Sequence, residues 1–127
     1  MFAFLRLTNH LLALLAGLLG AAGVVAAAAA AHGGFGENLQ TASIFALIHG
    51  ALVMALVRGE ATRLSTCAAA LALTGALLFC GDLSARAILK TGLFPMAAPV
   101  GGYLMIFAWL AASADAALRL KSGAKPD

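Results

Sequence analysis

Four long stretches without a single Asp, Glu, Lys or Arg occupy most of this chain, at residues 7–31, 39–57, 64–81 and 93–114. The hydrocarbon core of a bilayer is about 30 Å thick, and a helix needs about 20 apolar residues to cross it. Each stretch is close to that length, and the segments between them are too short to fold as a soluble domain. The sequence therefore predicts an all-α membrane protein, a four-helix bundle with helices at about 8–31, 39–57, 64–85 and 97–118.

The composition supports the same class. Hydrophobic residues make up 63% of the chain and charged residues 10%, whereas soluble domains are about 45–50% apolar and about 25% charged. A soluble fold of 127 residues could not bury so much apolar surface. We therefore expect a single integral membrane domain over residues 1–127.

The basic residues favour one orientation in the membrane. Four crossings place both termini and the 58–63 loop on one side, which then carries Arg6, Arg58, Arg63, Arg119, Lys121 and Lys125. The opposite side carries only Arg86 and Lys90. Because basic residues accumulate in cytoplasmic loops, both termini are predicted to be cytoplasmic. The basic residues are scattered and lack interleaved aromatics, so nucleic acid is not an expected partner.

The N-terminal segment also has features of a secretory signal. Arg6 precedes a leucine-rich core at 11–19 and an alanine run at 26–31, which resemble a signal peptide with its cleavage site. The apolar run is longer than the usual hydrophobic core of about 7–15 residues. Retention as the first transmembrane helix is therefore the favoured interpretation, with cleavage as the alternative.

Small residues mark the expected helix contacts. Helices in lipid associate by close backbone packing, which small side chains permit. The candidate packing residues are Gly17, Gly20, Gly23, Pro99, Gly101 and Gly102. A cofactor lying on the bare face of the first helix is a weaker alternative. Pro99 is expected in the first turn of its helix, Thr62 or Ser65 as a helix cap, and Asn38 as the cap of the second helix.

Polar residues inside the apolar stretches are costly and carry the functional information. His49 lies in the middle of the second stretch, where a neutral imidazole hydrogen-bonded across the bundle is expected. The alternatives are a ligand, proton-relay or cofactor role, and a contact with lipid or a partner. Asp82 and Arg86 are spaced for a local i, i+4 ion pair. The competing interpretation is a contact between His32 and Asp82, with Glu37 or Gln40 nearby.

The other polar residues do not form a pattern typical of a catalytic, metal or cofactor site. His10 and Asp115 are expected to be solvated at helix ends, and Cys67 and Cys80 to be small buried apolar residues. The three histidines fall at different depths, so they do not form paired haem ligands, and the donors are too scattered for zinc. No metalloprotease or serine-hydrolase motif is present. We therefore expect no metal, no cofactor, no catalytic residues and no enzymatic activity.

Several segments resemble a known family in the same order along the chain. They are Ala31-His32-Gly33, Gln40-Thr41-Ala42 with His49, Leu78-Phe79-Cys80-Gly81, Ala98-Pro99-Val100-Gly101-Gly102 and Trp109-Leu110. Together they resemble the YgdD-like small inner-membrane proteins, known as domain of unknown function 423. Cys80 and Asp82 replace small hydroxyl residues of the family pattern, and Ala108 replaces a glycine. The resemblance implies a compact four-helix membrane protein and names no reaction.

The sequence leaves two functional hypotheses. The leading hypothesis is a non-enzymatic integral protein of a bacterial cytoplasmic (inner) membrane, which acts as an accessory, structural or assembly subunit of a larger membrane complex. Its expected partners are membrane lipids and other membrane subunits. The alternative is a small solute or ion transporter or channel, in which His49 and the His32/Asp82 end line a polar path. The absence of a carboxylate at mid-membrane weakens the alternative.

Overall fold

The computed structural model describes residues 1–123 and contains four helices. They are α1 (Phe2–His32), α2 (Gly36–Arg58), α3 (Arg63–Ile88) and α4 (Ala97–Gly123). All four are long and apolar enough to cross a membrane, and no strand occurs within residues 1–123. This confirms the predicted all-helical class and indicates a multi-pass membrane protein. The expected tail residue Lys125 lies outside the described residues.

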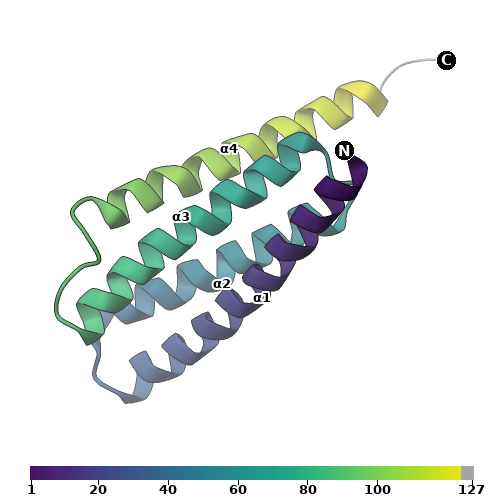
Figure 1. The fold of residues 1–127 in the computed structure, drawn as a ribbon. Helices are drawn as coiled ribbons and strands as arrows, with labels where there is room; N and C mark the ends of the chain where they lie inside the picture. Colours follow the sequence, from purple (N-terminus) through teal and green to yellow (C-terminus); the bar gives the residue numbers. More distant parts are fainter. Residues whose placement is uncertain (124–127) are drawn as a thin grey trace.

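Successive helices run in opposite directions, so the bundle has two distinct ends (Figure 1). The terminal end contains the start of α1, the α2–α3 connection and the end of α4. The far end contains the α1–α2 and α3–α4 connections. The principal contacts join α1 to α2, α2 to α3 and α3 to α4, with a smaller contact between α1 and α3. The bundle is therefore open, with α1 and α4 on its flanks.

The helix boundaries follow local capping signals, with one correction. Thr62 caps α3 through a reciprocal pair with Ser65: the Ser65 N–H donates to Thr62 Oγ1 (3.0 Å), and the Thr62 N–H donates to Ser65 Oγ (2.9 Å). Pro99 lies in the first turn of α4, as expected. The predicted cap at Asn38 is wrong, since α2 already begins at Gly36. Gly36 has a positive φ of 76°, which a glycine adopts readily, so the turn closes before Asn38.

α3 forms the centre of the core because its contact faces carry small side chains. Ala68, Ala69, Ala72 and Ala76 are completely inaccessible. At Gly75 the backbone of α4 comes so near that an added Cβ would lie 2.7 Å from the carbonyl oxygen of Gly101. The reverse also holds, because a Cβ on Gly101 would lie 2.6 Å from the Phe79 nitrogen. The α3–α4 contact is therefore a close backbone crossing of the kind that small residues permit.

A second crossing joins α1 to α2 through Gly50, where an added Cβ would lie 3.0 Å from the carbonyl oxygen of Ala16. Of the predicted packing residues on α1, Gly23 would meet Leu47 at 3.0 Å and Gly17 would meet Met54 at 3.3 Å. A Cβ on Gly20 would face open space, although the Gly20 backbone lies beside Gly50.

The predicted packing residues of α4 behave differently from one another. Gly101 lies at the close crossing with α3, whereas a Cβ on its neighbour Gly102 would have nothing within 4 Å. Pro99 is exposed. Contact was predicted for all three from their small or rigid side chains alone. The rotational position of α4 then turns Gly101 toward α3 and leaves Gly102 facing open space.

Candidate functional site

His49 is a buried histidine at the middle of α2, and it is held by two hydrogen bonds. Its side chain is 3% exposed. Nδ1 lies 2.9 Å from the carbonyl oxygen of Phe45, and Nε2 lies 3.2 Å from Nε1 of Trp109 on α4. An indole N–H only donates, so Nε2 must accept, and the ring proton must be on Nδ1, where it is donated to Phe45. A neutral imidazole satisfies both contacts, in agreement with the predicted cross-bundle hydrogen bond.

Aromatic contacts complete this mid-bundle group. The Phe45 and His49 rings stack with centroids 5.8 Å apart, and the Trp109 ring meets the imidazole edge-on at 6.2 Å. The His49–Trp109 contact links α2 directly to α4. Trp109 is half-exposed, so one edge of the indole is bonded while the rest lies on the outer surface. Sequence reasoning missed Trp109 as the partner; the available signal was an indole N–H in an apolar helix, which requires an acceptor.

Asp82 is fully buried near the far end of α3 and joins that helix to the following loop. Its Oδ2 accepts a hydrogen bond from Arg86 Nε at 2.8 Å, and its Oδ1 accepts one from the Leu93 N–H, also at 2.8 Å. The predicted i, i+4 ion pair is therefore present. The loop passes so close that a Cβ on Gly92 would lie 2.7 Å from Oδ1. Asp82 thus ties the α3–α4 connection to the end of α3.

The alternative grouping around Asp82 does not form. His32 and Gln40 are both exposed, and the two carboxylate oxygens of Asp82 are occupied by Arg86 and Leu93. His32 is the last residue of α1, a helix whose main partner is α2. The far end therefore contains separate polar groups instead of a shared His32–Asp82 site.

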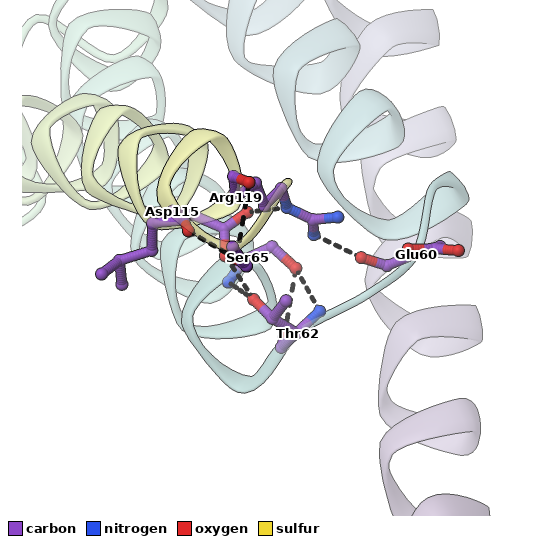
Figure 2. Close-up of polar contacts among 7 residues, drawn as sticks. Glu60, Thr62, Ser65, Asp115 and Arg119 are labelled. Atoms are coloured by element: carbon purple, nitrogen blue, oxygen red, sulfur yellow. Dashed lines mark hydrogen bonds and ion pairs between the residues drawn. The ribbon is translucent and has the colours of Figure 1, made fainter. Parts of the chain in front are cut away.

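Asp115 was expected to be solvated, and this expectation is wrong. It is 7% exposed and accepts a hydrogen bond from Arg119 Nε at 2.8 Å and another from the Thr62 hydroxyl. Arg119 also donates to the backbone carbonyl of Glu60. Figure 2 shows these side chains meeting where α4 passes the start of α3. Asp115 looks peripheral in sequence because its helix position is near the chain end, but the α2–α3 connection covers it.

Asp82 and Asp115 make the same pattern of contacts. Each aspartate pairs with the arginine four residues later on its own helix and also binds a group from a connection between helices. Asp82 holds the α3–α4 connection at the far end, and Asp115 holds the α2–α3 connection at the terminal end. The contacts of Asp82 and Asp115 therefore stabilise the α3–α4 hairpin at both of its ends, and the Gly75–Gly101 crossing lies between them.

The remaining polar groups also make structural contacts. The Thr66 hydroxyl donates to Asn9 Oδ1 at 3.0 Å and so joins α3 to α1. The Ser43 hydroxyl donates to the carbonyl oxygen of Gln40 on its own helix. In the described part of the chain, every buried side-chain nitrogen or oxygen has a partner. Within residues 1–123, no three His, Cys, Asp or Glu side chains gather closely enough to hold a metal ion.

The cysteines differ from the expectation that both are buried. Cys80 is buried, whereas Cys67 is exposed on the outer surface of α3. The pattern of apolar residues could not distinguish them, because both faces of a membrane helix are apolar.

Two of the hollows on the surface of residues 1–123 lie between helices. The first, of about 750 Å³, lies at the terminal end between the start of α1 and the end of α2, and is lined by Arg6, Asn9 and Arg58 among others. The second, which we call the α1/α3 groove, has a volume of about 190 Å³ and is walled by α1 and α3 over α2. Its lining includes Ala22, Ala26, Ala42, Ala46, Cys80, Gly81 and Ser84.

Comparison with known proteins places the chain in a family. The model of a family described as a protein of unknown function (DUF423) matches residues 19–102, well over half of the sequence. The chain belongs to this family. The matched segment of the DUF423 family includes His49 and Asp82, while Trp109 and Asp115 lie beyond it. No curated protein and no solved structure matches the chain.

Proposed function

We propose that this protein is a non-enzymatic, multi-pass protein of the bacterial cytoplasmic membrane that acts as an accessory or assembly subunit of a larger membrane complex. The observation that carries the proposal is the α1/α3 groove. A transmembrane helix of another subunit is its proposed occupant.

The lining of the groove suits a helix. Ala22 and Ala26 form one wall, and Cys80, Gly81 and Ser84 form the other. Small side chains allow a helix backbone to come near, and close packing is the main force between helices in lipid. The groove exists because α1 packs chiefly on α2 and only slightly on α3. An incoming helix would complete the contact that α1 and α3 leave open.

The polar groups support a structural role. Both nitrogens of His49 are occupied, and the carboxylates of Asp82 and Asp115 are paired with arginines and loop groups. These contacts stiffen the bundle and occupy the hydrogen-bonding groups of His49, Asp82 and Asp115. They also give less support to the transport alternative, which requires His49, His32 and Asp82 to line one path.

The charge distribution supports the orientation. Arg6, Arg58, Arg63, Arg119 and Lys121 lie at the terminal end. Basic residues next to transmembrane helices favour the cytoplasmic side. We therefore place the terminal end in the cytoplasm, which leaves the far-end loops in the periplasm.

The proposal is tested by matched substitutions on α1. Ala21 and Ala22 are adjacent and both exposed, but only Ala22 lines the groove. A photo-crosslinking residue at Ala22 is expected to capture one defined membrane protein in native membranes, while the same residue at Ala21 captures lipid. Ala22→Leu should remove that protein from the gently solubilised complex, and Ala21→Leu should retain it. A free protein in mild detergent, with no crosslink specific to Ala22, would contradict the proposal.

A further inference from the structure

The hollow at the terminal end has charged and polar side chains in its lining, whereas the α1/α3 groove is lined mainly by small apolar ones. It lies between the first turns of α1 and the last turn of α2 and has a volume of about 750 Å³, within the range of about 300–1,000 Å³ typical of small-molecule sites. Its polar lining comes from Arg6, Asn9, His10 and Arg58, and its apolar lining includes Phe2 and Val57. No acidic residue lines it.

Within residues 1–123, neither arginine of the hollow pairs with a carboxylate. The ion pairs within residues 1–123 are Asp82–Arg86 and Asp115–Arg119, so the charges of Arg6 and Arg58 remain available. The Asn9 oxygen already accepts from Thr66, which leaves the amide N–H groups as the hydrogen-bonding capacity of Asn9. The hollow therefore presents positive charge and donors, the complement of a phosphate.

The position of these arginines sets the depth of the hollow in a membrane. Arg6 immediately precedes the charge-free stretch 7–31, and Arg58 immediately follows the charge-free stretch 39–57. Both guanidinium groups thus lie where the hydrocarbon core gives way to the headgroup layer. A ligand there would have its phosphate beside the arginines and its apolar part beside residues such as Phe2 and Val57.

We infer that the hollow binds the headgroup of an anionic phospholipid. A soluble phosphate would use the arginines but not the apolar lining, whereas a lipid uses both. Basic pockets between transmembrane helices on the cytoplasmic side are suited to anionic headgroups. The inference rests on the proposed cytoplasmic orientation of the terminal end, and it is independent of the α1/α3 groove and of any protein partner.

The test uses the detergent-purified full-length protein. It is titrated with phosphatidylglycerol or phosphatidylcholine, and the lipid-bound fraction is measured by native mass spectrometry. The double variant Arg6→Gln/Arg58→Gln removes both charges of the hollow. Each basic residue near an anionic lipid contributes about fivefold in affinity, so the double variant should bind phosphatidylglycerol about 25-fold more weakly.

A matched control removes the same charge from the same end. Arg63 and Lys121 are exposed and lie outside the hollow, so Arg63→Gln/Lys121→Gln should change the affinity less than threefold. The variant Arg6→Lys/Arg58→Lys keeps the charge and should retain most of the binding.

Three results would overturn the inference. Equal binding of phosphatidylcholine would show that the headgroup charge is irrelevant. An equal loss in the control variant would show diffuse attraction to a basic end. Displacement of the lipid by millimolar inorganic phosphate would identify a soluble anion as the ligand. Because no partner protein is present, the outcome does not depend on the proposed accessory role.

Discussion

The adjacent glycines Gly101 and Gly102 allow the α3–α4 crossing to be tested with one methyl group. In Gly101→Ala the new Cβ would lie 2.6 Å from the Phe79 nitrogen and 2.7 Å from the Gly75 oxygen, whereas ordinary contacts begin at 3.4 Å. Both opposing atoms belong to a helix backbone, so α4 must move away from α3 by roughly 0.8 Å. Overpacking of this kind costs about 1–3 kcal/mol. In Gly102→Ala the methyl group meets nothing within 4 Å.

The two variants share the same gain in helix propensity, about 0.5–1 kcal/mol for glycine to alanine. This gain cancels when they are compared, so Gly101→Ala should be less stable than Gly102→Ala by about 1–3 kcal/mol. Gly102→Ala itself should equal or exceed the parent protein in stability.

The assay is unfolding by sodium dodecyl sulfate in mixed micelles. The single tryptophan, Trp109, lies on α4 and bonds to α2, so its fluorescence reports directly on whether α4 is docked. Equal free energies of unfolding for the two variants would refute the close crossing at Gly101. A more stable Gly101→Ala would refute it as well.

Three further predictions concern the polar contacts. Trp109→Phe removes the hydrogen bond to His49, so it should lower the free energy of unfolding by about 0.6 kcal/mol and at most about 1.7 kcal/mol. Unfolding of this variant is followed by circular dichroism. An unchanged stability would mean that the bond contributes nothing. Thr62→Ala should lower stability by about 0.5–2 kcal/mol through loss of the α3 cap, and further through loss of the hydroxyl bond to Asp115. Thr62→Ser keeps the hydroxyl and should restore the stability in thermal melts. A loss of equal size in both variants would show that the hydroxyl does not contribute. Gly92→Ala should accelerate proteolysis of the α3–α4 loop, since its Cβ would lie 2.7 Å from the buried carboxylate oxygen of Asp82. The exposed neighbour Thr91 provides the control variant Thr91→Ala. Equal cleavage of the two variants would count against the contact between Asp82 and this loop.

Some interactions within one helix could be predicted from sequence because helical geometry fixes their spacing, although the Asp115–Arg119 pair on α4 was missed. The Asp82–Arg86 pair is four residues apart, and the reciprocal Thr62–Ser65 cap is three residues apart. Such neighbours meet in any α-helix, whatever surrounds it. The same reasoning failed at Asn38, where two glycines with positive φ allowed α2 to begin earlier.

Interactions between helices were not readable in this way. The Trp109–His49 bond joins residues 60 apart, and the Thr62–Asp115 bond joins residues 53 apart. Neither separation carries a periodic signal. The burial of Asp115 depended on the path of a loop from another part of the chain, and the difference between Cys67 and Cys80 depended on which face of α3 was covered.

The sequence by itself determined that the chain has four membrane-length helices, because the length and charge of each apolar stretch are local properties. It also determined which end of the bundle is basic. Only the tertiary structure decided that Gly50 and Gly75 lie at the backbone crossings, that Gly102 does not, and that α1 and α3 leave a groove between them. Those features depend on the rotation and spacing of packed helices. Because these helices are apolar on every face, the hydrophobic pattern does not predict how each helix is rotated.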